Sequence, residues 1–265
     1  MATVNWHPGR LLQPPSANVN PPEFALLILN QPIKNGANLR KLWKNSTQRI
    51  AADGGANRLH ELSSFQGKYS NLQAIVGDLD SLRPSVRDFY LSQPKPTEIV
   101  HMPDQESTDF LKSVNWIRSH CASPTDIVAL GGIGGRVDQG LSQLHHLYLF
   151  QADDAAYAKG RVYLLSGSSL TFLLKAGSHH IHVREDGVDN EFGKHVGIIP
   201  LKGTSRITTS GLEWDVEDWE TEIGGKVSTS NHVLPDTRVV EIQTTADVLF
   251  TIALRQLDTE EEGQM

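Results

Sequence analysis

Short apolar runs alternate with amphipathic stretches from about residue 24 to residue 155 of the chain. The runs predict strands, and the stretches between them carry apolar residues at helical spacing. Two helical sets stand out: Phe110, Leu111, Val114 and Ile117 in residues 107–120, and Leu141, Leu144 and Tyr148 in residues 137–150. We expect each helix to dock its set on a mostly parallel, doubly wound sheet, the α/β layout. The predicted strands are 24–29, 49–52, 72–76, 98–102 and 127–130.

The pattern changes after Gly160 to short runs of alternating or β-branched residues, separated by turn residues. Such spacing is typical of an antiparallel sandwich or barrel. The predicted strands there are 161–165, 170–174, 180–183, 198–201, 205–209, 226–229, 238–243 and 248–253. The sequence therefore predicts a Pro-rich tail or surface strap at 1–22, an α/β domain at 23–155, an all-β domain at 160–256 and an acidic tail at 257–265, with a polar linker at 152–160.

The net charge of -7 over 265 residues leaves no basic excess to neutralise a nucleic-acid backbone. The longest apolar run, 24–29, is too short to span a bilayer and lacks the charged flank of a signal peptide. The single cysteine, Cys121, cannot form an internal disulfide. We therefore expect no nucleic-acid partner, no membrane partner and a cytoplasmic protein.

Acidic residues follow the predicted strands of the first domain at the edge where open α/β sheets bind ligands. Asp53 follows 49–52, Asp78 and Asp80 follow 72–76, and Asp104 and Asp109 follow 98–102. Carboxylates that converge in this way suit Mg²⁺, which combines a few carboxylate oxygens with water and substrate phosphates. The structural alternative is that each aspartate caps a helix or forms a turn.

Two glycine-rich segments also lie between a strand and a helix, at Gly54-Gly55 and at residues 131–135, followed by Arg136. Such loops expose backbone N–H groups at a helix N-terminus, which favours anions. Neither segment has the Gly-Lys-Ser/Thr of a P-loop or opens the first unit as G-x-G-x-x-G. A purely structural role in tight turns stays open.

Clustered histidines raise the alternative of a zinc site; they are His145, His146, His179, His180 and His182. No HExxH or Cys-His spacing accompanies them, and the alternation of His180 and His182 fits one face of a strand. We therefore favour a structural role for these side chains.

Six segments of the chain, taken in order, form a distinctive set. They are Ala-Ala-Asp-Gly-Gly-Ala-Asn at 51–57, Gly-Asp-Leu-Asp-Ser at 77–81, Asp-Gln-Glu-Ser-Thr-Asp-Phe at 104–110, Gly-Gly-Ile-Gly-Gly-Arg-Val-Asp-Gln at 131–139, Gly-Leu-Glu-Trp at 211–214 and Val-Ser-Thr-Ser-Asn at 227–231. Together they resemble the thiamine pyrophosphokinase family from about residue 24 to residue 253. The departures are the Pro-rich N-terminal segment and residues 185–195, which do not align clearly.

The resemblance implies an N-terminal α/β domain, a C-terminal β-sandwich and a homodimer with active sites in clefts between subunits. It implies catalytic roles for Asp78, Asp80 and Asp109, and Mg²⁺ held by these and Asp53. On the ATP side it implies Asp53, Gly54, Gly55, Asn57, Gly132, Gly134, Gly135, Arg136, Asp138 and Gln139. On the thiamine side it implies Gln105, Asp109, Trp214, Ser228, Ser230 and Asn231.

The implied reaction moves the diphosphate of ATP to the hydroxyl of thiamine and gives thiamine diphosphate and AMP. Asp109 is the candidate to orient or deprotonate the hydroxyl. Trp214 could stack on cationic thiamine, or could be an ordinary half-buried strand aromatic. Two other functions stay open: another Mg²⁺-dependent phosphotransferase or nucleotide hydrolase, and a non-catalytic thiamine- or nucleotide-binding module.

Overall fold

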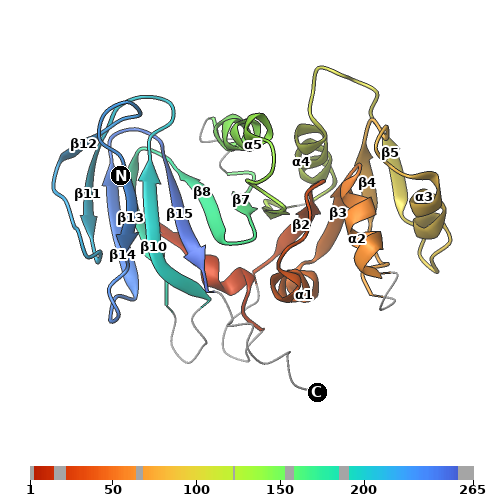
Figure 1. Cartoon of the computed structure of the whole chain (residues 1–265), viewed down its shortest axis with the longest axis horizontal. Coiled ribbons are helices and arrows are strands. Elements are labelled where there is room, and N and C mark those ends of the chain that lie inside the picture. The colour runs from red at the N-terminus through yellow and green to blue at the C-terminus, as the bar shows by residue number, and fades with distance from the viewer. Residues whose placement is uncertain are drawn as a thin grey trace. The chain divides into compact units, whose positions relative to one another are not determined.

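The computed structural model describes residues 3–14, 22–63, 68–121, 123–152, 158–184 and 191–255. The chain forms two compact units (Figure 1). The α/β unit is Pro14–Gly167, and the β unit joins Met1–Gln13 to Ser168–Met265. In the described part of the chain, no helix combines the length and apolar character needed to cross a membrane. The predicted acidic tail and residues 153–157 of the predicted linker lie outside the described residues.

The α/β unit alternates strands and helices as the apolar pattern predicts. Its elements are β2 (Phe24–Ile28), α1 (Gly36–Asn45), β3 (Gln48–Ala52), α2 (Gly55–Ser63), β4 (Ala74–Gly77), α3 (Pro84–Leu91), β5 (Glu98–His101), α4 (Asp109–His120), β6 (Asp126–Leu130), α5 (Val137–Phe150) and β7 (Val162–Leu165). All residues of β2 are buried, as expected for a central parallel strand.

The strand order in this unit is β7-β6-β2-β3-β4-β5, and every neighbouring pair is parallel. Because crossovers are right-handed, α1 to α3 cover one face on the way from β2 to β5, and α4 and α5 cover the other on the way back to β7. This confirms the doubly wound prediction. The order reverses between β2 and β6, which is the switch point where such sheets bind ligands.

The predicted docking face of α5 is wrong, whereas that of α4 is confirmed for Phe110, Val114 and Ile117, with Leu111 half-buried. The buried residues of α5 are Gln143, His146, Leu147 and Phe150. Leu141 is 58% exposed, and Leu144 and Tyr148 are only half-buried. Polar side chains turn inward because they have partners: Gln143 accepts the Ile133 N–H, and His146 Nε2 lies 2.9 Å from Thr108 Oγ1. An apolar stripe remains on the outer face of the helix.

The β unit is a sandwich of two sheets. Its elements are β1 (Val4–Trp6), the 3-10 helix η1 (Pro8–Leu11), β8 (Ser169–Leu174), β9 (Gly177–His182), β10 (Phe192–Ile199), β11 (Ser205–Ser210), β12 (Trp219–Thr221), β13 (Ser228–His232), β14 (Val239–Thr244) and β15 (Val248–Leu254). Within this unit the strand orders are β1-β9-β14-β11-β12 and β13-β10-β15-β8. Phe172 and Phe250 are fully buried between the sheets.

Two segments belong to a different part of the fold than the domain boundaries predicted from the sequence would place them. The run 161–165 was placed in the all-β domain, but β7 pairs in parallel with β6, and the α/β unit extends to Gly167. The N-terminal segment is no simple tail, because β1 pairs with β9 and the fully buried Trp6 stacks on Phe172 at 4.5 Å. Pro8 suits the first turn of η1 and does not prevent this docking.

Candidate functional site

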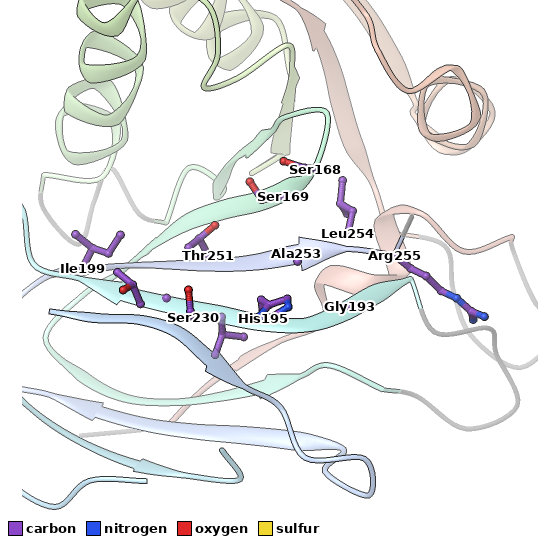
Figure 2. Close-up of a pocket in the computed structure, with 13 residues that line it drawn as sticks. Ser168, Ser169, Gly193, His195, Ile199, Ser230, Thr251, Ala253, Leu254 and Arg255 are labelled. Atoms are coloured by element: carbon purple, nitrogen blue, oxygen red, sulfur yellow. The ribbon is translucent and has the colours of Figure 1, made fainter. Parts of the chain in front are cut away.

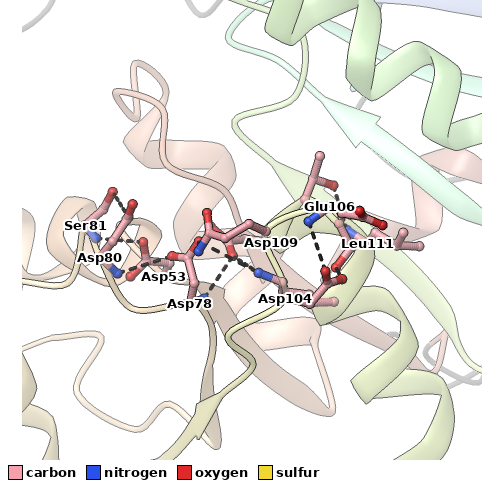
Figure 3. Close-up of polar contacts among 12 residues, drawn as sticks. Asp53, Asp78, Asp80, Ser81, Asp104, Glu106, Asp109 and Leu111 are labelled. Carbon is pink, nitrogen blue, oxygen red and sulfur yellow. Dashed lines mark hydrogen bonds and ion pairs between the residues drawn. The ribbon is translucent and has the colours of Figure 1, made fainter.

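Acidic residues meet at the carboxyl edge of the parallel sheet (Figure 3). Asp53 directly follows β3, Asp78 and Asp80 follow β4, and Asp109 opens α4 after β5. One oxygen from each of Asp53, Asp78 and Asp80 lies within 4.8 Å of the others. We call these three residues the acidic cluster. Among the described residues it is the only group of three or more candidate metal ligands.

Asp109 lies beside the acidic cluster and is joined to it through the backbone. Its Oδ1 accepts the N–H of Asp78 at 3.2 Å. Gln105 approaches from the same connection and donates its Nε2–H to Asp78 Oδ2 at 3.0 Å. Asp104 instead accepts hydrogen bonds from Glu106 and Ser107 and stays exposed. The structure therefore brings Gln105 and Asp109 to the cluster, while Asp104 shapes its own turn.

Asp53 is buried, on a strained backbone, in surroundings that are unfavourable for a charged carboxylate. It is 2% exposed and has a φ of 37°, a left-handed backbone that non-glycine residues rarely adopt. Its Oδ2 accepts the Ser81 N–H at 3.0 Å, whereas its Oδ1 is buried without a hydrogen-bond partner in the described part of the chain. Such strain and an orphaned buried oxygen are concentrated at functional sites.

The carboxylates at this edge differ in the direction in which their pKa values are shifted. Burial, and then the charges of Asp109, Asp80 and Asp78, raise the pKa of Asp53 to about 6, against the Ser81 hydrogen bond. Burial and the charge of Asp78 also raise the pKa of Asp109. For Asp78, burial alone would raise the pKa, but hydrogen bonds from Asp80 and Gln105 and the charge of Lys112 together lower it.

Lys112 is a site residue that the sequence analysis missed. Its Nζ lies 3.5 Å from Asp109 Oδ1 and 3.8 Å from Asp78 Oδ2, and the side chain is only 4% exposed. It offsets part of the negative charge that gathers at this edge. The available signal was its position three residues after Asp109 on a predicted helix, where both side chains share one face.

A divalent cation fits this arrangement. The donors are all carboxylate oxygens, which hard cations prefer, and Oδ1 of Asp53, which has no hydrogen-bond partner in the described ranges of the chain, supplies one ligand. A cation there would also offset the burial and the neighbouring negative charges that raise the pKa of Asp53.

The glycines near the cluster permit close backbone approach. A Cβ on Gly77 would lie 2.8 Å from Asp109 Oδ1 and 2.8 Å from Asp53 Cβ. A Cβ on Gly55 would lie 2.2 Å from the Ile28 carbonyl oxygen, and one on Gly54 would meet Asn30. These positions need glycine for packing around the acidic cluster.

Asn57, predicted on the ATP side, uses its side chain within the protein. Its Nδ2 donates to the Ser81 carbonyl oxygen at 2.7 Å, and its Oδ1 accepts the Arg83 N–H at 3.2 Å. The residue therefore fixes the segment that follows Asp80.

The second glycine-rich segment lies after β6, at the same edge of the sheet. Gly131 and Gly135 have φ values of 90° and 70°, which the sharp turn into α5 requires. Gly132 packs on Leu164, whereas a Cβ on Gly134 would meet open space. The exposed Arg136 pairs with the exposed Asp138 at 2.6 Å, and the adjacent Gln139 is exposed too. This segment offers backbone and cationic groups to an anion from solvent.

The predicted thiamine residues of the β unit line two hollows. Trp214, which is 55% exposed, lines a hollow of about 170 Å³ with Ser228, Asn231 and Trp219. Ser230 lines another, of about 580 Å³, with His195 and Thr251 (Figure 2). The set is therefore divided between two faces. His195 was missed because nothing in its sequence context indicates which face of β10 it occupies.

Asn231 is buried, and its amide bonds the backbone of Trp214. It is thus turned inward although it lines the smaller hollow.

The histidine cluster has structural partners. The fully buried side chain of His179 accepts the Trp6 Nε1–H at its Nδ1 at 3.0 Å, and its Nε2 donates to the Lys175 carbonyl oxygen at 2.7 Å. Both ring nitrogens are in use, so His179 is unsuited to zinc.

Two protein-family models match the chain. "Thiamin pyrophosphokinase, catalytic domain" matches residues 39–157, and "Thiamin pyrophosphokinase, vitamin B1 binding domain" matches residues 178–249. The first match contains the acidic cluster, and the second contains Trp214 and β13.

Curated and solved proteins agree with these matches. Thiamine pyrophosphokinase 3 of rice is 36% identical over 249 residues, covering 88% of this chain and 87% of the relative. The crystal structure of yeast thiamin pyrophosphokinase superposes with a TM-score of 0.81 at 28% identity, covering 95% of this chain and 91% of that chain. Thiamin pyrophosphokinase from Candida albicans superposes with a TM-score of 0.80 at 27% identity, over 96% of this chain and 93% of that chain.

Proposed function

The chain belongs to the thiamin pyrophosphokinase family, and we propose that it transfers the diphosphate group of ATP to the hydroxyl of thiamine, giving thiamine diphosphate and AMP. The observation that carries this proposal is the convergence of Asp53, Asp78 and Asp80 within 4.8 Å, inside the segment that matches the catalytic domain. An acidic edge of this kind, in an otherwise ordinary α/β sheet, suits the binding of a metal-nucleotide complex.

We propose Mg²⁺ as the cation, held by the acidic cluster with Asp109 beside it. When bound, it supplies positive charge that neutralises the phosphate oxygens of ATP. The carboxylate donors and the orphaned Oδ1 of Asp53 support this choice.

In the reaction, the thiamine hydroxyl oxygen attacks the β-phosphorus in line with the bridging oxygen to the α-phosphate. The new P–O bond forms as the bridging P–O bond breaks, and AMP leaves with the bonding electron pair. Asp109 takes the hydroxyl proton or orients the hydroxyl, and its raised pKa makes it a better base than an exposed carboxylate. Lys112 fixes Asp109 and Asp78 relative to each other.

The segment after β6 is the proposed ATP side. Gly134 leaves open space for a phosphate, and the N-terminus of α5 favours negative charge. Arg136, which pairs with Asp138, adds a cation. We include Gln139 on this side because it neighbours that pair on the exposed first turn.

Thiamine is a cation with flat rings, and we propose that the exposed indole of Trp214 stacks on it. Ser228 lines the same hollow and offers a hydroxyl, whereas Ser230 faces the hollow of His195. The match of this segment to the vitamin B1 binding domain supports the assignment.

We further propose a homodimer in the cytoplasm. The exposed apolar side chains of α5, Val137, Leu141 and Leu149, support an interface with another copy. The lone Cys121 supports a reducing compartment. Analytical ultracentrifugation tests the first point: a species of twice the chain mass is expected, and a monomer at working concentrations would refute it.

Product analysis tests the reaction. Purified protein is incubated with ATP, Mg²⁺ and thiamine, and nucleotides and thiamine species are resolved by chromatography. We expect AMP and thiamine diphosphate in equal amounts, only when thiamine is present. ADP with thiamine monophosphate would indicate an ordinary kinase, and thiamine-independent release of phosphate would indicate a nucleotide hydrolase. Thiamine binding without turnover would indicate a binding module.

A further inference from the structure

We propose that Asn231 is a positioning residue that acts through Trp214: its side chain holds the Trp214 backbone so that the indole is presented to thiamine, and it makes no contact with thiamine itself. This rests on the proposed function, in which Trp214 receives thiamine. It assigns to Asn231 a role different from the direct binding expected from its motif.

The hydrogen bonds of Asn231 leave little of its amide for a ligand. Its Oδ1 accepts the Trp214 N–H at 3.2 Å and the His232 N–H at 2.8 Å, and its Nδ2 donates to the Trp214 carbonyl oxygen at 2.9 Å. A carboxamide oxygen has two lone pairs, and both are used. The side chain is also buried, with the residue 5% exposed. The amide therefore clamps both backbone groups of a single residue.

The rest of the loop 211–215 is fixed just as closely. Asp215 accepts the Gly211 N–H at 2.9 Å and the Leu212 N–H at 3.2 Å. Leu212 forms a β-bridge with Val233, and the Glu213 N–H donates to the His232 carbonyl oxygen at 2.8 Å. The polar groups of the loop thus face inward, onto β13 and onto Asp215.

Trp214 is the exception, since its backbone is held and its side chain points outward. The residue is 55% exposed, which is unusual for the largest apolar side chain on an otherwise well-satisfied loop. His232 lies beside the indole, with ring centroids 5.0 Å apart, and its Nδ1 is 2.5 Å from Glu213 Oε2. The indole therefore has a fixed imidazole beside it, and more than half of the residue stays exposed. A rigid backbone under an exposed indole is how a stacking surface is preorganised.

The proposal predicts that the effect of mutating Asn231 on thiamine binding depends on whether Trp214 is present. If Asn231 acts only through Trp214, removing its amide matters only while the indole is present. If Asn231 also touches thiamine, its removal weakens binding with or without the indole. A double-mutant cycle separates these cases.

The experiment compares wild type, Trp214→Ala, Asn231→Ala and the double variant, with thiamine KM and kcat from turnover and thiamine Kd from calorimetry. We expect Trp214→Ala to raise KM and Kd about 30-fold and Asn231→Ala about tenfold, with kcat within about threefold of wild type. The double variant should match Trp214→Ala alone. Multiplied effects, about 300-fold in the double variant, would overturn the proposal.

Two further variants keep the test independent of folding. Asn231→Asp retains an oxygen for the Trp214 N–H but places a carboxylate oxygen against the Trp214 carbonyl oxygen, and we expect a rise in KM at least as large as for Asn231→Ala. Ser205→Ala removes another buried hydrogen bond of the β unit, to Thr244 at 2.8 Å, and should lower the melting temperature without raising KM. An equal rise of KM in Ser205→Ala would mean that the Asn231 effect is general destabilisation.

The outcomes also separate this inference from the proposed function. Thiamine binding without diphosphate transfer in wild type would reject the proposed function, and the Kd cycle would still decide the role of Asn231. Normal transfer with an unchanged KM in Trp214→Ala would reject the positioning role and leave the reaction intact.

Discussion

Asp53 at the carboxyl edge of the α/β unit has one buried carboxylate oxygen without a hydrogen-bond partner among the described residues, whereas Asp215 and Asn231 in the β unit use their side chains to bond backbone groups. The first region brings like charges together on a strained backbone. In the second region, the polar side chains have hydrogen-bond partners within the β unit. The difference indicates that the acidic edge is completed by its ligands, whereas the loop 211–215 is built before its ligand arrives. The two regions should therefore respond in opposite ways to mutation, metal and pH.

The largest effect is expected when the acidic edge is neutralised. Asp78→Asn combined with Asp80→Asn removes two of the three clustered carboxylates while keeping their shape. We expect kcat to fall on the order of 10³-fold, about 4 kcal/mol of transition-state stabilisation. Circular dichroism and the melting temperature should show an intact fold. Asp104→Asn is the matched control, because this exposed acid accepts its hydrogen bonds from Glu106 and Ser107 in its own turn; a similar loss there would argue for a general charge effect.

A comparably large effect, on stability, is expected in the core of the β unit. Trp6 is fully buried and stacks on Phe172, so Trp6→Ala should cost about 3 kcal/mol or more of unfolding free energy. Urea unfolding measures this loss. The exposed Trp214→Ala supplies the comparison and should cost less than about 1 kcal/mol. Equal costs would mean that the N-terminal segment is not part of this core.

An intermediate effect concerns the pH dependence of the metal-free protein. The pKa of Asp53 is raised from 3.8 to about 6, so between these values the folded state binds more protons than the unfolded state. Its contribution to stability is present below pH 4 and is lost as pH rises through 6. Asp53→Asn should remove this decline and be more stable than wild type at pH 7 by about 2 kcal/mol.

Unfolding of both proteins in EDTA across pH 4–7 measures the difference in their free energy of unfolding. In a second series with Mg²⁺ in place of EDTA, this difference should shrink, because the cation stabilises only the wild type. A wild type more stable than Asp53→Asn in EDTA at pH 7 would show that this carboxylate is already satisfied without a cation.

The smallest effect is expected at the ATP side. Arg136 and Asp138 are 76% and 58% exposed, so Arg136→Ala should change stability by less than about 0.5 kcal/mol. The KM for ATP should rise a few-fold, because the cation near the phosphates is lost. Arg206→Ala in the β unit removes another exposed arginine, 45% exposed and paired with Asp218, and should leave that KM unchanged. An unchanged KM in Arg136→Ala would remove Arg136 from the ATP side.

The α/β fold was predictable because each of its strands contains an apolar run and helix α4 carries a clear helical period. The docking face of α5 was not predictable, because Gln143 and His146 are buried by virtue of hydrogen-bond partners from other parts of the fold. The N-terminal strand was missed because three residues before a proline carry no pattern, and their position depends on a buried partner, Phe172.

The candidate site likewise contains residues that the sequence predicts and residues that it does not. The acidic cluster was predictable because parallel strands deliver their following residues to one edge. Lys112 was missed because its role arises from contacts that only folding creates. The motif containing Asn231 marks the residue but does not reveal whether its amide faces a ligand or the Trp214 backbone.

Direct titration with Mn²⁺, a paramagnetic substitute for Mg²⁺, tests most directly whether the acidic edge is completed by a cation. The electron paramagnetic resonance signal of free Mn²⁺ is followed as wild-type protein, the Asp78→Asn/Asp80→Asn variant and Asp104→Asn are added, with and without ATP. We predict that wild type and Asp104→Asn remove the free signal, most strongly with ATP, and that the double variant removes only what ATP binds by itself. Equal Mn²⁺ binding by the double variant would contradict the account.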